Sequence, residues 1–85
     1  MKKHYAGDID PLLIKLAEDV RRLRKANGLS QEALALVADV DRTYVSQLER
    51  CVANPSIVIL QRVAEALGVS LVIELRAPSE TVADR

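Results

Sequence analysis

The sequence predicts a mainly α-helical domain of four short helices followed by one strand. Three observations support this prediction. Apolar residues recur at helical spacing over most of the chain, helix-capping residues separate the periodic stretches, and the last apolar segment alternates with a period of two. The chain has 85 residues, of which 49% are hydrophobic, with two tyrosines and no Phe or Trp. These values are typical of a single small domain with an aliphatic core.

Composition excludes several kinds of site. The single cysteine, Cys51, excludes an intramolecular disulfide and a cysteine-based zinc site, and the single histidine, His4, makes a histidine metal site just as unexpected. We therefore expect no metal and no cofactor. No apolar run approaches the roughly 18 residues of a membrane span, and residues 1–10 lack the apolar core of a signal peptide, so we expect a cytoplasmic protein. Twelve basic residues balance twelve acidic ones, so net charge gives no indication of nucleic-acid binding.

The first helix is predicted to begin where Asp10 caps it and Pro11 takes its first position, and to end at residues 27–28, an Asn-Gly pair. Residues 1–9 ahead of it are expected to form a flexible tail. The apolar positions of this helix share one face: Leu12, Leu13, Leu16, Ala17, Val20 and Leu23.

Residues 29–50 contain two short helix patterns joined by a turn, which is the pattern of a helix-turn-helix. Ser30 can cap the first helix and Asp41 the second, and only residues 38–40 separate them. So short a connection makes the helices cross steeply and turns Val40 inward. The expected apolar positions are Leu34 and Val37 in the first helix, and Val45 and Leu48 in the second.

The second of these helices keeps a polar face outside the expected core. Its side chains are Arg42, Thr43, Tyr44, Ser46, Gln47 and Arg50. Arg, Gln, Ser and Thr near a helix N-terminus are side chains that read base edges and hold phosphates in a DNA major groove. A solvated helix face is the alternative interpretation of the same pattern.

A fourth helix is expected to begin after Pro55, with Ser56 as its cap, and to end at Gly68. Val58 and Ile59 lie off its apolar stripe, which indicates either a wide stripe or contact with another chain. The stripe itself consists of Ile57, Leu60, Val63, Ala64 and Leu67.

Residues 71–76 alternate apolar and other side chains, which predicts a strand. A lone strand needs a partner, and the simplest partner is the same segment of a second subunit. A short helix capped by Ser70 is the alternative, and residues 77–85 are expected to form a flexible tail. The expected interface of this homodimer comprises Val58, Ile59, Leu71, Val72, Ile73 and Leu75.

From about Leu12 to Ser70, the segments RRLRKANGLSQEALALVADVDRTYVSQLER and NPSIVILQRVAEALGVS resemble the Cro/CI-type, or xenobiotic response element, family of bacterial regulators. The resemblance implies a compact, lambda-repressor-like helix-turn-helix domain over residues 10–70. It also implies operator DNA bound by a two-fold dimer through the third helix. The strand-like end resembles HipB-like antitoxins more than repressors that end in a fifth helix.

The resemblance also implies roles for individual residues. The residues that fall where the family reads bases are Arg42, Thr43 and Gln47, with Arg42 suited to guanine and Gln47 to adenine. Expected phosphate contacts come from Gln31, which can also brace a neighbouring side chain, and from Tyr44, Ser46 and Arg50. Arg24 and Glu49 match the family's partly buried ion pair between the first and third helices.

The chain departs from the family pattern at three further places. Asp39 stands in the turn where the family usually has Gly, and Asp tolerates the positive φ that the turn needs. Residues 51–53, Cys-Val-Ala, replace a Gly and a basic residue, which removes an expected phosphate contact. Val58 and Ile59 replace residues that are usually polar.

These patterns favour a sequence-specific transcriptional regulator, a repressor or autoregulator that binds double-stranded DNA as a homodimer. Two alternatives are an antitoxin that also binds a toxin protein, and a restriction-modification controller, because DRTYVSQLER also resembles those small activators. An enzyme is not expected. The sequence has no Cys/His pair, phosphate loop or metal-ligand spacing, and Ser46 beside Glu49 has no base.

Overall fold

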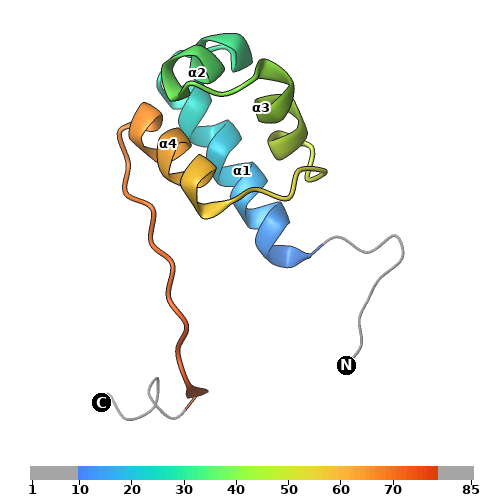
Figure 1. The fold of residues 1–85 in the computed structure, drawn as a ribbon, viewed down its shortest axis with the longest axis vertical. Helices are drawn as coiled ribbons and strands as arrows, with labels where there is room; N and C mark the ends of the chain where they lie inside the picture. The colour runs from blue at the N-terminus through green and yellow to red at the C-terminus, as the bar shows by residue number, and fades with distance from the viewer. Residues whose placement is uncertain (1–9, 79–85) are drawn as a thin grey trace.

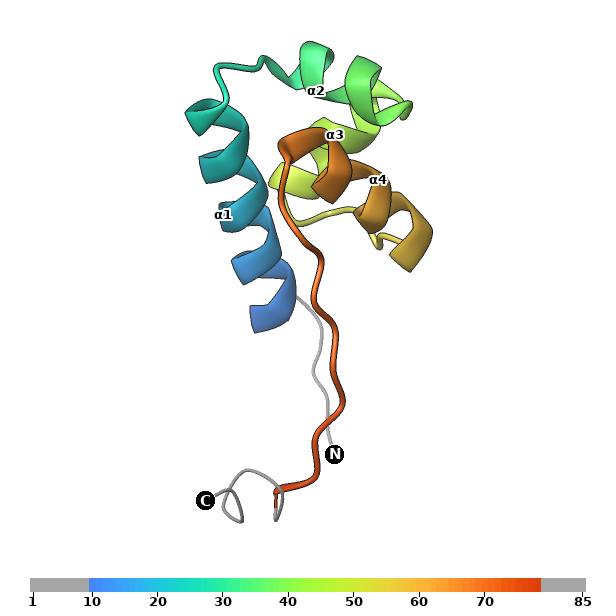
Figure 2. The same ribbon diagram turned by 90° about the vertical axis from the view of Figure 1, so that its left-hand side faces the viewer.

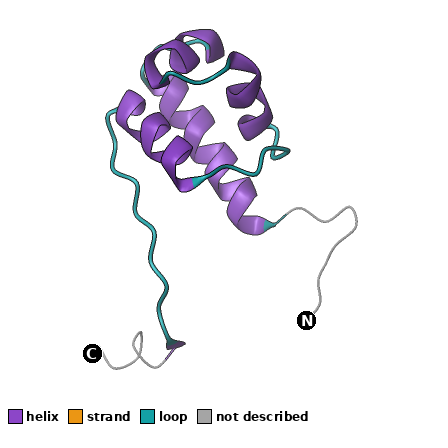
Figure 3. Cartoon of the chain, viewed as in Figure 1, coloured by secondary structure: helices purple, strands orange, loops and turns teal. Residues whose placement is uncertain are grey.

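The computed structural model describes residues 10–78, which form four helices (Figures 1 and 3). These are α1 (Pro11–Ala26), α2 (Gln31–Ala38), α3 (Arg42–Glu49) and α4 (Ile57–Leu67). The prediction of four helices is therefore confirmed. None of them is both long enough and apolar enough to cross a lipid bilayer. The predicted tail over 1–9, and the predicted tail over 77–85 from residue 79 onward, lie outside the described residues.

Three of the four helices begin at the side-chain caps that the sequence predicts. Asp10, Ser30 and Ser56 each accept a hydrogen bond from a backbone N–H of the first turn, at 2.8 to 3.1 Å. The prediction for Asp41 is wrong in one respect, because its side chain makes no cap hydrogen bond with α3. The Asp41 backbone carbonyl instead accepts the N–H of Tyr44 at 2.9 Å.

The core lies where α2 meets both α3 and α4, with α1 packed against α3 (Figures 1 and 2). Four side chains are removed from solvent almost completely: Leu34, Val45, Leu48 and Val63. Each contributes about 1.5 to 3 kcal/mol through burial. The two short helices of the helix-turn-helix are thus fixed by side chains that project into one shared core.

Three residues that were expected in the apolar stripes are exposed instead. Val37 is 61% exposed because α2 turns Leu34, Ala35 and Ala38 toward the core, and their face excludes position 37. Leu12 and Ile57 lie in the first turns of α1 and α4, and their side chains are 78% and 63% exposed. Helical periodicity predicts the helices correctly but includes too many residues in their buried faces.

The short turn between α2 and α3 contains a residue with positive φ. Asp39 adopts the left-handed conformation, with φ 60° and ψ 48°, as expected for the residue that replaces the usual glycine. Val40 is partly buried against the core, so it does anchor the pair of helices. Arg62 of α4 donates a hydrogen bond to the Asp39 carbonyl at 3.4 Å.

The predicted strand over residues 71–76 is not formed. Residues 69–77 follow α4 as an irregular segment that leaves the helices, and residues 10–78 contain no strand (Figures 1 and 2). The alternative, a short helix beginning at Ser70, is absent there as well. The physical reason is that strand geometry requires a ladder partner, and no other described segment supplies one. The resemblance to HipB-like antitoxins at this end is therefore not supported.

Candidate nucleic-acid interface

Helix α3 separates a buried face from a polar one. Val45, Leu48 and Glu49 face inward, whereas Arg42 and Thr43 in the first turn are exposed. Arg50, the residue that follows the helix, is also exposed, and the half-buried side chains on the flanks are Tyr44, Ser46 and Gln47. Arg42, Ser46 and Arg50 recur every four residues, so they share one side of the helix. The structure thus brings the expected base-reading residues and most expected phosphate contacts onto one accessible surface.

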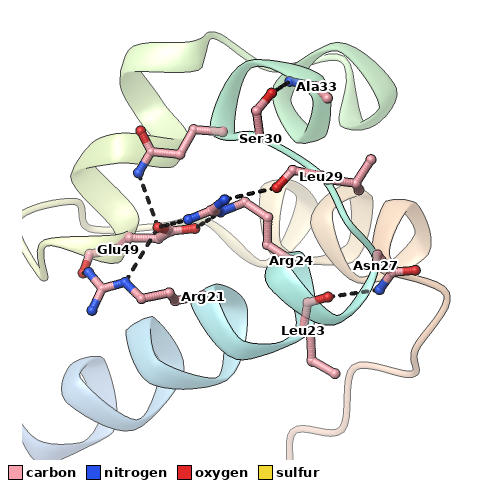
Figure 4. A network of polar contacts seen from close by, with 9 residues as sticks. Arg21, Leu23, Arg24, Asn27, Leu29, Ser30, Ala33 and Glu49 are labelled. Atoms are coloured by element: carbon pink, nitrogen blue, oxygen red, sulfur yellow. Dashed lines mark hydrogen bonds and ion pairs between the residues drawn. The ribbon is translucent and has the colours of Figure 1, made fainter.

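Behind this surface, the Glu49 carboxylate is buried and paired with Arg24 of α1 (Figure 4). Arg24 Nε lies 2.6 Å from Glu49 Oε2, and Arg24 Nη2 donates to Glu49 Oε1 at 3.0 Å. Such a two-point pair between charged groups fixes direction as well as distance. It joins the last turns of α1 to the end of α3, and these are the two residues that the family resemblance implies.

Two further side chains converge on Glu49. Gln31 Nε2 at the start of α2 donates to Glu49 Oε1 at 3.1 Å. Arg21 Nη2 donates to the Glu49 backbone carbonyl at 3.0 Å, and Arg21 Nε lies 3.6 Å from Glu49 Oε1 (Figure 4). Arg24 Nη1 also donates to the Leu29 carbonyl at 2.9 Å. We call Arg21, Arg24, Gln31 and Glu49 the Glu49 network. It ties α1, α2 and α3 together behind the exposed face.

The Glu49 network differs from the sequence prediction in two respects. One N–H of Gln31 is engaged by Glu49, so only the second N–H of its amide is available for a phosphate. Arg21 was not identified from the sequence. Its position three residues before Arg24 places both on one face of α1, and this spacing was the available signal.

Electrostatics hold the Glu49 network in its charged form. Burial by itself raises the pKa of the Glu49 carboxyl, but hydrogen bonds from Arg24 and Gln31 outweigh it and leave this pKa below its ordinary value. The hydrogen bond to Glu49 also raises the pKa of Arg24. Both groups therefore remain ionised at neutral pH, and α3 is anchored by a full ion pair.

Tyr44 lies at the edge of the polar face. Burial raises the pKa of its phenol, and a hydrogen bond with the backbone of Ser56 partly offsets this. The phenol is therefore neutral at physiological pH and keeps a proton to donate. Its position beside Ser56 also links the flank of α3 to the start of α4.

The chain after α3 carries no basic residue over residues 51–53. Cys51 adopts φ 65°, the left-handed conformation that glycine takes most readily. Its half-buried Sγ lies 3.8 Å from the Leu13 carbonyl of α1. Val52 is exposed and Ala53 is buried, so this segment closes the core and offers no cation to a phosphate.

The residues expected at a dimer interface fall into two groups. Ile59 is partly buried against the core, so much of its surface is already covered within the chain. Leu71 is half-buried as well. The remaining ones are exposed apolar side chains: Val58, Val72, Ile73 and Leu75.

Comparison with known proteins identifies relatives of the same size. The family model described as Helix-turn-helix matches residues 20–73. Control protein C.MunI from Mycoplasma sp is 36% identical over 64 residues, which cover 74% of this chain and 86% of that protein. The crystal structure of the restriction-modification controller protein C.AhdI from Aeromonas hydrophila is 41% identical and superposes with a TM-score of 0.69. That match covers 72% of this chain and 92% of the other.

A second similar structure is a controller protein bound to DNA. The restriction-modification controller protein C.Esp1396I, solved as a tetramer with its natural 35-base-pair operator, is 36% identical with a TM-score of 0.69. This match covers 72% of this chain and 80% of that one. Solved variants of C.Esp1396I replace an arginine, a threonine or a tyrosine at three consecutive positions. Arg42, Thr43 and Tyr44 are the same three residue types in the same order.

Proposed function

The chain belongs to the helix-turn-helix family, and we propose that it is a sequence-specific DNA-binding transcriptional regulator of the restriction-modification controller kind. One observation carries the proposal. The exposed face of α3 has an Arg-Thr-Tyr series like the one varied in an operator-binding controller, and the Glu49 network fixes that face from behind. Helix α3 enters the major groove, and the regulator acts by occupying its operator near a promoter.

Direct reading of bases is assigned to Arg42, Thr43 and Gln47. Arg42 is exposed in the first turn, where its guanidinium can donate two hydrogen bonds to a guanine. Gln47, one turn further along, has the amide geometry that suits adenine. Each well-formed pair of this kind contributes about 1 to 3 kcal/mol of discrimination against a wrong base.

Phosphate contacts are assigned to Gln31, Tyr44, Ser46 and Arg50. These side chains surround the base-reading residues, and three of them offer neutral donors while Arg50 offers a charge. With residues 51–53 lacking a cation, one copy of the chain has few phosphate anchors. A homodimer doubles them, and its two α3 helices read an inverted repeat with half-sites about 34 Å apart.

The antitoxin alternative is not supported. The relatives described above are control or controller proteins, and none of them is an antitoxin. The C-terminal strand that suggested a HipB-like antitoxin is absent from residues 10–78. A toxin partner therefore has no observation in its favour.

Selection of bound sequences from random duplex DNA tests the proposed function. Wild-type chain should recover an inverted repeat, and Arg42→Ala should relax the preference at one position in each half-site and weaken binding about 10- to 100-fold. Arg22→Ala is the matched control, because Arg22 is an exposed arginine on α1 that pairs with Asp19. If Arg42→Ala and Gln47→Ala recovered the wild-type sequence with unchanged affinity, α3 would not be the reading helix.

A further inference from the structure

An apolar groove lies between α1 and α4, and no residue of α3 lines it. Its volume is about 250 Å³, and its walls include Leu12, Leu16 and Leu23 from α1 and Leu60 and Leu67 from α4. Voids in a packed protein interior are seldom larger than a single water molecule, so a space of this size is a groove and not a packing defect. Leu12 remains 78% exposed at one end. The floor of the groove, including Leu67, is buried within the chain, whereas Leu12 at its edge is left open to solvent.

The chain itself forms one edge of this groove and then departs from it. Residues 69–72 line the groove, and the following stretch, residues 73–76, which we call the C-terminal arm, runs away from the helices in both views (Figures 1 and 2). Ile73 is 56% exposed and Leu75 is 98% exposed. An exposed apolar segment beside an exposed apolar groove marks a surface that is covered in an assembly.

The arm does not fold back into the groove of its own chain (Figures 1 and 2). To return Leu75 to the groove, residues 72–75 would have to form a tight turn, with Ile73 and Glu74 as its two central residues. Residues 69–77 also contain no Gly and no Pro, the residues that most favour a tight turn. Leu75 is therefore directed outward by the same residues that form the groove edge.

Charges at the two surfaces are complementary. On α1, Lys15 and Asp19 form an ion pair of 2.7 Å at the groove. On the arm, Glu74 and Arg76 flank Leu75 and form another ion pair of 2.7 Å. When Leu75 of one chain enters the groove of another, Glu74 can pair with Lys15 of the other chain, and Arg76 with Asp19. No charge is then left unpaired.

We propose that the C-terminal arm of a second copy of this chain occupies the groove, with Leu75 packed against Leu12 and Leu16. Two copies that exchange their arms reciprocally about a two-fold axis form a contact that closes at a dimer. The inference deepens the proposed function, because it assigns the surface that joins the two copies on the operator. It involves side-chain packing in the groove and does not require a paired strand.

Disulfide trapping tests which chain supplies the arm. In a Cys51→Ser background, a Leu12→Cys chain is mixed with a tagged Leu75→Cys chain and oxidised without DNA. The mixed disulfide should form about tenfold faster than in a control mixture of Leu36→Cys with Leu75→Cys. Leu36 is a matched control because its exposure, 82%, is close to that of Leu12, and it lies outside the groove on α2. Equal rates in the two mixtures would overturn the proposal.

A single chain carrying both cysteines separates the proposed contact from folding back of the arm. In dilute solution, this Leu12→Cys/Leu75→Cys chain should give disulfide-linked dimers that disappear on further dilution before oxidation. A disulfide formed within one chain at high dilution would overturn the proposal, because it would place the arm in its own groove.

Sedimentation equilibrium of the full chain measures the energetic role of the arm. Leu75→Asp should raise the dimer dissociation constant roughly a hundredfold or more, since a two-fold dimer loses two buried leucines. Val52→Asp is the control, because Val52 is 61% exposed in the loop between α3 and α4 and lies outside the groove. A wild-type chain that stays monomeric, or a Leu75→Asp dimer as tight as wild type, would overturn the proposal.

The experiments distinguish a failure of the proposed function from a failure of the proposed arm contact. A chain whose dimer depends on Leu75 but which selects no DNA sequence contradicts the proposed function and supports the arm contact. A chain that selects an inverted repeat while its dimer ignores Leu75 contradicts the arm contact and supports the proposed function.

Discussion

Two leucines mark the difference between the helix-turn-helix and the C-terminal arm. Leu34 in α2 is fully buried, whereas Leu75 in the arm is 98% exposed, although both lie in apolar stretches of the sequence. The helix-turn-helix is specified by contacts within one chain, such as the core around Leu34 and the Glu49 network. In the arm, Ile73 and Leu75 are exposed, and the ion pair of Glu74 with Arg76 joins two residues of the arm itself. A pattern predicts structure reliably only where its partner lies in the same chain.

The largest expected effect is the removal of the central acid of the Glu49 network. Glu49→Ala leaves the positive charge of Arg24 without its buried partner, so the free energy of unfolding should fall by about 3 to 5 kcal/mol. Urea unfolding followed by circular dichroism measures this loss. Glu65→Ala is the matched control, since Glu65 is an exposed acid on α4 whose carboxylate accepts a hydrogen bond from Gln61 on the same helix. A loss as small as that of the control would mean that the network is a surface feature.

The next effect compares the two leucines directly. Leu34→Ala should lower the free energy of unfolding by about 2 to 5 kcal/mol, because it leaves a cavity in a packed core. Leu75→Ala should change it by less than about 0.5 kcal/mol when both are measured far below the dimer dissociation constant. At high protein concentration the effect of Leu75→Ala should grow, because dimerisation then contributes to stability. Equal losses at low concentration would show that the arm is folded onto its own chain.

The same contrast explains what could be predicted from the sequence. Caps at Asp10, Ser30 and Ser56 are local features, and so is the short turn that brings Asp39 to positive φ. Because local rules decide such features, the four helices and their order were predictable. The pairing of Arg24 with Glu49 came from the family resemblance and could not have come from spacing alone, since 25 residues separate them.

The errors arise where the outcome depends on three-dimensional contacts. Val37 fits the helical period of α2, but Ala35 and Ala38 form the inner face and leave it exposed. The role of Arg21 depends on where the end of α3 lies, which periodicity does not give. The alternation over 71–76 does place apolar side chains at every second residue, Leu71, Ile73 and Leu75. A strand also needs backbone partners, and none lies in residues 10–78.

A smaller effect should appear when the Glu49 network is titrated. The folded state holds the pKa of Glu49 below its unfolded value, so its contribution to stability is fully present above about pH 4.5 and is lost as pH falls through the folded pKa. The loss should be smaller than in Glu49→Ala, because protonation keeps the side chain in place. Unfolding free energies measured between pH 7 and pH 3 give this slope.

Two variants isolate the source of that slope. Glu49→Gln should flatten the dependence on pH below 4.5, because the titrating group is gone. Hydrogen bonds from Lys15 and Arg22 also lower the pKa of Asp19, but this pair is on the surface, so Asp19→Asn should change the slope little. If the slope of the unfolding free energy against pH vanished in Asp19→Asn and persisted in Glu49→Gln, the acid sensitivity would come from the surface of α1 and not from the Glu49 network.

The smallest effect concerns the backbone at the end of α3. Cys51 holds φ 65° without being glycine, so Cys51→Gly should raise the free energy of unfolding by about 0.5 to 1 kcal/mol. Asp39→Gly should gain less, because Asp tolerates the left-handed conformation better than Cys does.

Gly28→Ala is the reverse control. A Cβ at residue 28 meets nothing within 4 Å, so the loss of stability comes only from the φ of 69°. This loss should be about 1 kcal/mol. If Cys51→Gly instead destabilised the chain, the contact of the Cys51 side chain with α1 would outweigh its backbone strain. The loop after α3 would then owe its shape to packing within the chain, as the helix-turn-helix does.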